Sequence, residues 1–169
     1  GNVTGGGDWG QDRLLPDIFY ALANNKQMVI RNPQAIRPWQ HVCEPLSGYL
    51  NLARKIYEQG SEFGGAWNFG PSDNANKKVS WIANYVQEKI PGSLPWTTSG
   101  KENSYESQIL KLDNNKAGNY LDWHPTLSVD QALDWTVDWH KAWLEKQNMQ
   151  KYTLNQIKKF KDMLEPKIV

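Results

Sequence analysis

Stretches of sequence that could form β-strands are few and short in this chain, whereas helical patterns fill most of its length. The candidate strands are residues 28–30, a segment entered from a loop at 37–42, residues 66–69 and residues 109–112. An independent sheet usually has about five or six strands. We therefore expect a helix-rich α/β fold whose sheet is incomplete.

The first seven residues, Gly1-Asn2-Val3-Thr4-Gly5-Gly6-Gly7, have no starter methionine and resemble the end of a strand that runs into a glycine loop. Because a chain seldom begins in the middle of a fold, we expect this sequence to be a fragment of a longer protein.

Capping residues and prolines mark the expected helices. Asp12 can cap a helix from 13 to about 24, in which Pro16 is tolerated because it falls in the first turn. Ser128 and Gln131 form a capping box for a helix that runs to about residue 145. Further helices are expected at 45–60, about 77–90, 113–121 and about 153–164.

The 169 residues carry 19 basic and 18 acidic side chains, so a net charge of +1 gives no field that would recruit nucleic acid. The single cysteine, Cys43, excludes an internal disulfide framework and a multi-cysteine zinc site. No apolar run approaches the ~20 residues of a membrane span. We expect one soluble, cytoplasmic domain.

Gly5, Gly7 and Gly10 match the spacing of a dinucleotide-binding glycine motif. The acidic residue that should follow about 20 positions later is missing, and Arg31 and Asn32 stand there instead. We interpret the glycines as a tight loop beside a ligand.

His41 and Cys43 would share one face of a strand, but no further ligands complete a zinc site.

Arg31 and Arg37 bracket a loop-like stretch. The planar guanidinium suits a diphosphate, and two of them could neutralise one. The alternative is that both are solvated loop arginines.

Nine tryptophans are an unusually high number for a chain of this length, and three of them, Trp135, Trp139 and Trp143, form one stripe of a helix. That stripe could stack on sugars, but it more commonly indicates a core or an interface.

Six segments stand out together: Gly-Asn-Val-x-Gly-Gly-Gly-Asp-Trp (1–9), Asp-Arg-Leu-x-Pro-Asp (12–17), Val-Ile-Arg-Asn-Pro (29–33), Arg-Pro-Trp-Gln-His-Val (37–42), Glu-Pro-Leu-Ser-Gly-Tyr-Leu (44–50) and Trp-Asn-Phe-Gly-Pro (67–71). With Leu-Lys-Leu-Asp (110–113), Trp-His-Pro (123–125) and Tyr-Thr-Leu (152–154), they cover nearly the whole chain. They resemble the C-terminal part of the CDP-glucose 4,6-dehydratases, which belong to the extended short-chain dehydrogenase/reductase family.

The resemblance implies a substrate-binding lobe joined to the last strands of a Rossmann-type sheet, with residues 1–169 as the sugar-nucleotide-binding part. Such enzymes oxidise C4 of the hexose with bound NAD, eliminate water across C5 and C6, and return the hydride to C6. The product, CDP-4-keto-6-deoxyglucose, feeds deoxysugar and O-antigen biosynthesis. The resemblance further implies a homo-oligomer when the enzyme is complete.

NAD binding and the catalytic Tyr-x-x-x-Lys pair are expected in the N-terminal part of such an enzyme, outside this chain. We therefore expect no catalytic residue and no dehydratase activity in the chain by itself. By resemblance, the substrate-binding residues are Asn2 for the sugar nucleotide, Arg13 and Leu14 beside the nucleotide, Ile30 and Arg31 beside the base, Arg37 on the diphosphate, and Tyr105 and Glu106 in a further pocket loop.

Two alternatives remain open. The chain could come from another extended-family dehydratase or epimerase that acts on a different nucleotide sugar. It could also be a truncated, non-catalytic module that holds a nucleotide sugar without converting it.

Overall fold

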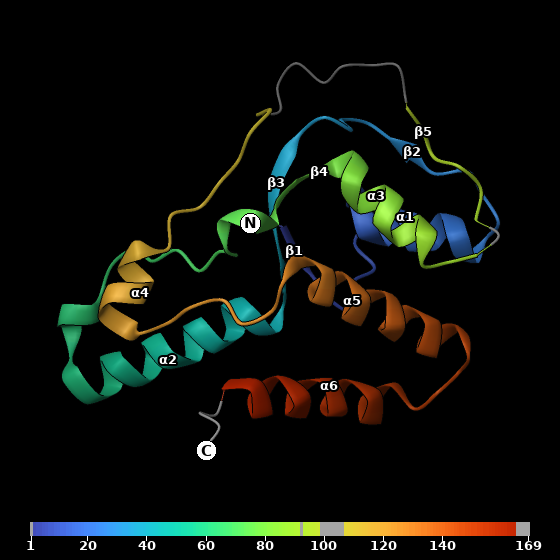
Figure 1. Ribbon diagram of the computed structural model, residues 1–169. Helices are drawn as coiled ribbons and strands as arrows, with labels where there is room; N and C mark the ends of the chain where they lie inside the picture. Colours follow the sequence, from blue (N-terminus) through green and yellow to red (C-terminus); the bar gives the residue numbers. More distant parts are fainter. Residues whose placement is uncertain (1, 92, 99–106, 165–169) are drawn as a thin grey trace.

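The computed structural model describes residues 2–91, 93–98 and 107–164, in which six α-helices surround two small sheets (Figure 1). The helices are α1 (Leu14–Ala23), α2 (Cys43–Gln59), α3 (Val79–Glu88), α4 (Asn115–Leu121), α5 (Val129–Leu144) and α6 (Met149–Leu164). The strands are β1 (Asn2–Thr4), β2 (Val29–Ile30), β3 (Ile36–His41), β4 (Asn76–Lys78) and β5 (Thr97–Thr98). The expected helix-rich α/β fold is confirmed.

The longest strand, β3, forms the centre of the larger sheet. Its second half pairs in parallel with β1, and its first half pairs antiparallel with β4, so the two neighbours cover different halves of β3. Pro38 lies in the half that faces β4, where the described part of β1 does not reach. A proline disfavours a strand flanked on both sides because it has no N–H to donate. The expectation of a loop at Arg37 and Pro38 is therefore wrong, since this half of β3 pairs with β4 and, on its other side, only Ile36 makes a described bridge, to Ile109.

The main core lies where α1, α3 and α5 meet the sheet. It combines Ile18 of α1, Ile82 and Val86 of α3 and Leu133 of α5, all at most 2% exposed, with Trp39 of β3. The apolar positions of all three helices recur at intervals of three and four residues, so each helix presents one apolar face to this core. The core holds the sheet edge and α1 in fixed relation, and these are the elements that border the candidate site.

A smaller core joins α2 to α4 on the other side of the sheet (Figure 1). It contains Phe69, Leu121 and Trp123. Residues 66–69, expected as a strand, are not one. The Asn114 side chain accepts from the amide of Gly70 at 2.7 Å and donates to its carbonyl at 2.7 Å. At Gly70, which follows this segment, a side chain thus makes the hydrogen bonds that a neighbouring strand would make.

Helix α5 begins with the predicted capping box of Ser128 and Gln131. Its tryptophan stripe is divided: Trp135 and Trp139 are buried, whereas Trp143 is 42% exposed. Two hydroxyls tie α5 to the sheet, because Thr136 donates to the Thr4 hydroxyl at 3.2 Å.

Helix α2 carries an apolar stripe that faces solvent, made of Leu46, Tyr49, Leu50, Ala53 and Ile56. In the sequence these residues recur at intervals of three and four, which predicts an apolar helix face, and the face exists. No described element covers it, and Leu50 is 72% exposed.

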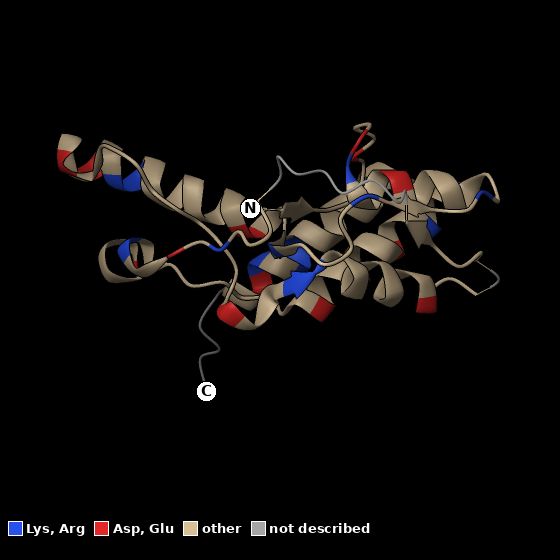
Figure 2. Ribbon diagram, turned by 90° about the horizontal axis from the view of Figure 1, so that it is seen from above, with Lys and Arg blue, Asp and Glu red and all other residues tan. Residues whose placement is uncertain are grey.

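Basic and acidic residues are dispersed over the elements in view in Figure 2, in agreement with the net charge of +1. Among the described residues, no helix has the length and apolar character needed to cross a membrane.

Candidate functional site

A cavity of about 970 Å³ lies between β1, β3, α1 and the segment that includes β2. All its described lining residues fall between positions 2 and 39, apart from Val79 and His140. The cavity volume is within the range of about 300–1,000 Å³ that is usual for small-molecule sites.

The cavity brings together the substrate-binding residues predicted from the sequence. Tyr105 and Glu106 lie outside the described residues. The six others all line the cavity, namely Asn2, Arg13, Leu14, Ile30, Arg31 and Arg37.

Arg37 is a buried cation at this cavity. Its position in β3 leaves only 7% of the residue exposed, and its Nη1 donates to the carbonyl of Ile36 at 2.9 Å. A buried guanidinium needs hydrogen-bond acceptors or an anion around it. The alternative of a solvated loop arginine is therefore wrong for Arg37.

Arg31 lies at the rim, where it binds Asp12 twice. Its Nη1 is 3.3 Å from the Asp12 carboxylate, and its Nη2 donates to the Asp12 carbonyl at 3.1 Å. Asp12 has a left-handed backbone, with a φ of 61°, and α1 starts at Leu14 after Arg13, without a side-chain cap. The expectation that Asp12 caps α1 is wrong, because its carboxylate turns to Arg31.

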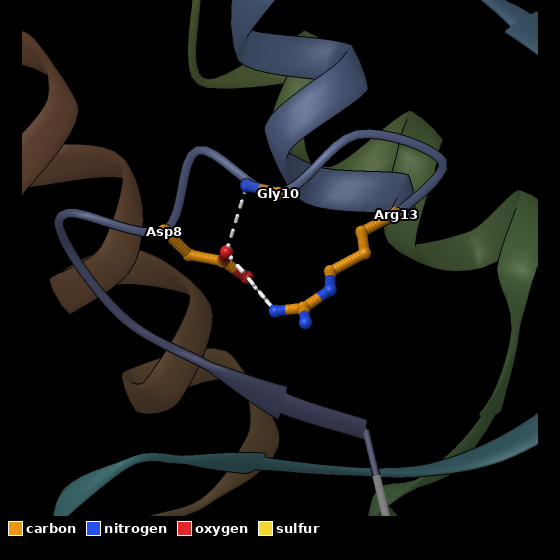
Figure 3. A network of polar contacts seen from close by, with 3 residues as sticks. All are labelled: Asp8, Gly10 and Arg13. Carbon is orange, nitrogen blue, oxygen red and sulfur yellow. Dashed lines mark hydrogen bonds and ion pairs between the residues drawn. The ribbon is translucent and has the colours of Figure 1, made fainter.

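Arg13 is held by the loop that precedes α1 (Figure 3). The Asp8 carboxylate accepts from Arg13 Nη1 at 3.1 and 3.3 Å, and its Oδ1 also accepts from the Gly10 amide at 3.1 Å. Asp8 thus closes the glycine loop and orients a cation that lines the cavity.

Part of the cavity lining is apolar. Met28 and Ile30 are each 3% exposed, and Leu14 adds a half-buried aliphatic side chain. His140 reaches the cavity from α5 and stacks on Phe19 with ring centroids 3.6 Å apart. Burial lowers the pKa of His140 to about 4, so the imidazole is neutral at pH 7. The sequence alone favours a structural role for His140, because a histidine on a helix face gives no signal of a contribution to a cavity.

Acidic residues accompany the cations. Asp8, Asp12 and Asp17 line the cavity with Arg13, Lys26, Arg31 and Arg37, which leaves an excess of one positive charge among the described lining residues. Burial, and then the neighbouring Asp12, raise the pKa of Asp17. A site of this kind favours an anion and can bind it with guanidinium forks.

The glycine motif at Gly5, Gly7 and Gly10 does not fit the pyrophosphate of a dinucleotide. The Asp8 carboxylate already accepts from the Gly10 amide, which a pyrophosphate would need. A Cβ on Gly6 would lie 2.0 Å from the Trp139 indole, so the loop is pressed onto α5. The loop is closed by its own residues, and we assign no NAD contact to it.

The catalytic Tyr-x-x-x-Lys pair is expected outside this chain, but the chain does contain one such spacing, at Tyr85 and Lys89 of α3, so an expectation that the spacing is absent here is wrong. Both residues bind Asp134: the Tyr85 hydroxyl donates to its carboxylate at 3.0 Å, and Lys89 Nζ lies at 2.8 Å. Neither lines the cavity. Burial and Asp134 raise the pKa of Tyr85, whereas a catalytic base needs a lower pKa. The pair therefore has no catalytic geometry.

His41 and Cys43 also differ from the expected pair on one strand. His41 ends β3, Cys43 begins α2, and the Cys43 amide donates to His41 Nδ1 at 3.3 Å. Burial lowers the pKa of His41 to about 4 and raises that of Cys43 to about 11. No cluster of potential metal ligands occurs among the described residues.

Comparison with known proteins connects this geometry to an enzyme family. The chain is 46% identical over 149 residues to a CDP-glucose 4,6-dehydratase from Salmonella typhimurium. The match covers 88% of this chain and 42% of the relative, so the chain spans less than half the length of that enzyme. The resemblance to CDP-glucose 4,6-dehydratases is confirmed. A scan against protein-family models finds no match.

Solved structures show the same architecture. An epimerase from Methanothermobacter thermautotrophicus has a TM-score of 0.71 at 21% identity, covering 89% of this chain and 43% of its own. A UDP-glucose 4-epimerase from Thermotoga maritima, with UDP-glucose, scores 0.69 at 18% identity, with coverages of 85% and 44%. A dTDP-glucose 4,6-dehydratase from Bacillus anthracis, with NAD, scores 0.59 at 16% identity, with coverages of 82% and 43%.

The fold is that of the extended short-chain dehydrogenase/reductases. In these terms the chain corresponds to the C-terminal lobe together with a few strands of the sheet.

Proposed function

We propose that the cavity binds a nucleoside diphosphate sugar, and that this sugar is CDP-glucose. The observation that carries the proposal is the burial of Arg37 beside an apolar wall, with Arg13 and Arg31 at the rim of the same cavity. A diphosphate needs cations with planar forks, and a base and a hexose need an apolar wall with a few polar groups.

The resemblance assigns a role to each of the individual residues, and their places in the lining of the cavity support these roles. Arg37 binds the diphosphate from the floor of the cavity, where low solvent exposure strengthens the interaction. Arg13 and Leu14 lie beside the nucleotide, Ile30 and Arg31 flank the base, and Asn2, at the start of β1, meets the sugar nucleotide. The preference for cytosine over the other pyrimidine bases is supported by the 46% identity to a CDP-glucose 4,6-dehydratase.

In the longer enzyme, the 169 residues would form the substrate-binding part of an NAD-dependent CDP-glucose 4,6-dehydratase that makes CDP-4-keto-6-deoxyglucose. NAD, bound mainly by the part that this chain does not contain, would accept and return the hydride. The residues of this chain bind and orient the nucleotide sugar. We further propose that the complete enzyme is a cytoplasmic homo-oligomer.

Calorimetry with the 169-residue chain tests the binding proposal. CDP-glucose should bind with a measurable Kd, and UDP-glucose and dTDP-glucose should bind more weakly. Glucose 1-phosphate, which lacks the nucleoside and one phosphate, should not compete. A preference for UDP-glucose or dTDP-glucose would move the assignment to another enzyme of the same fold, and no binding of any of them would overturn it.

Incubation with CDP-glucose and NAD tests the division of roles. We expect no 4-keto product, measured by its absorbance in alkali, because Tyr85 and Lys89 lie away from the cavity. Turnover by the pure chain would contradict this part of the proposal.

A further inference from the structure

We propose that Asp8 is a positioning residue for Arg13, and that it sets the affinity of the cavity for the diphosphate without touching the ligand. The inference rests on the proposed function. Both oxygens of Asp8 contact Nη1 of Arg13, at 3.1 and 3.3 Å, and the two side chains are 33% and 66% exposed (Figure 3). An arginine so exposed would otherwise sample many rotamers.

The loop that carries Asp8 is fixed against α5. Gly6 approaches the Trp139 indole so closely that no Cβ could be accommodated there. On the other side of Asp8, Trp9 packs on Trp143 with centroids 4.7 Å apart and meets the edge of His140 at 5.3 Å. Contacts on both sides therefore hold the carboxylate in place.

The Arg13 side chain lies back across the same loop. A Cβ on Gly10 would be 2.9 Å from Arg13 Nε, so only glycine leaves room for the guanidinium to approach the loop closely. The Gly10 amide also donates to Asp8. Gly10, Asp8 and Arg13 thus form one local unit.

The geometry favours orientation over competition with the ligand. Asp8 contacts Nη1, while the described contacts of Arg13 leave Nη2 and Nε to other acceptors. A guanidinium has five N–H donors in a fixed plane, so one edge can bind Asp8 while another binds a phosphate. Orienting the side chain in advance reduces the ordering cost of binding. If Asp8 competed with the diphosphate for Arg13, its removal would strengthen binding.

Asp8→Asn separates these two effects because the amide oxygen can still accept from Gly10 while the charge is lost. By calorimetry with CDP-glucose, we expect the Kd to rise about three- to tenfold, the range of a partly exposed charged pair with an added orienting effect. In the Arg13→Met background the same change should leave the Kd unaltered. Asp162→Asn, which removes one exposed charge on α6, is the matched control.

A second measurement needs no ligand. Side-chain NMR should show slower rotation and solvent exchange of the Arg13 guanidinium in the unmodified chain than in Asp8→Asn. Three results would each overturn the role of Asp8. The first is equal Arg13 side-chain dynamics in the unmodified chain and in Asp8→Asn, and the second is a lower Kd for CDP-glucose in Asp8→Asn. The third is an equal loss of CDP-glucose affinity when Asp8→Asn is made in the Arg13→Met background. If the NMR difference is present and CDP-glucose does not bind, the positioning stands and the proposed ligand is wrong.

Discussion

The carboxylate of Glu44 accepts a hydrogen bond of 2.6 Å from the amide of Leu127, which lies 83 residues further along the chain. It also accepts from the amide of Thr126, and Glu44 is 1% exposed. This buried group therefore ties the start of α2 to the segment that precedes α5. Replacing it should be costly, because the buried amide of Leu127 and the partly buried amide of Thr126 would lose their acceptor.

Glu44→Ala should lower the free energy of unfolding by about 2–4 kcal/mol. Chemical denaturation measures the change, and Glu58→Gln, at an exposed position of the same helix, is the control. Stability equal to that of the unmodified chain would mean that water replaces the carboxylate without cost.

The same residue gives stability a pH dependence. Burial raises the pKa of Glu44 above its ordinary value of 4.5, although the two amides oppose this shift. The folded state therefore binds the proton more tightly than the unfolded state, and stability falls as pH rises from about 4.5 through the raised pKa. Relative to Glu44→Gln, the unmodified chain should be most stable in acid and lose this advantage towards neutral pH. An advantage that grows with pH would show that the amide hydrogen bonds outweigh burial.

Arg37→Ala should weaken CDP-glucose binding by about 2–4 kcal/mol, because a buried diphosphate would lose its paired charge. Arg37→Lys should restore only part of the loss, since an ammonium cannot form the bidentate fork. Calorimetry gives the affinities, and thermal melting confirms that each variant is folded. Arg54→Ala, on the exposed side of α2, should have no effect. Unchanged affinity in a folded Arg37→Ala variant would remove Arg37 from the site.

Gly6→Ala should destabilise the chain by about 1–3 kcal/mol, because the added methyl would overlap the Trp139 ring and force the loop away from α5. Gly118→Ala is the matched control. There the nearest atom lies 3.0 Å away on His124, whose side chain is 71% exposed and can move, and alanine favours the helix. Equal stability of the two variants would mean that the loop can shift at no cost.

The apolar stripe of α2 should make the chain bind a hydrophobic dye and self-associate. Leu50→Glu interrupts the stripe at its most exposed member and should reduce both without lowering the melting temperature. Asn155→Glu adds the same charge on α6 and should change neither. Sedimentation and dye fluorescence measure the outcome, and a monodisperse, dye-silent chain would contradict the prediction.

Local signals predicted the helices well. The capping box at Ser128 and the prolines at 16 and 45 stand near the starts of α5, α1 and α2 as expected. The strands were harder to predict from the sequence, because β3 contains Pro38 and β5 has only two residues. Pairing with a partner strand, rather than local residue preference, determines where these strands form. The alternating residues 66–69 show the converse: alternation without a neighbouring strand produces no strand.

The resemblance named three cations that line the cavity, Arg13, Arg31 and Arg37, but not Lys26, and the sequence did not predict what surrounds them. The burial of Arg37 follows from strand pairing, and the contact of Asp8 with Arg13 depends on a turn whose geometry no spacing rule gives. The exposed face of α2 was predicted as an apolar face, and periodicity alone cannot say whether such a face is covered.

The lining of the cavity has a consequence for how ligand preference could change. Nearly all the described lining residues fall between positions 2 and 39, so one continuous stretch supplies most of the described cavity, while α2, α4 and α6 contribute none of these residues. Exchange of that stretch between related enzymes would transfer most of the cavity in a single recombination event. Gly6 and Trp139 mark the limit of such an exchange, since the incoming loop must still fit the indole that α5 supplies.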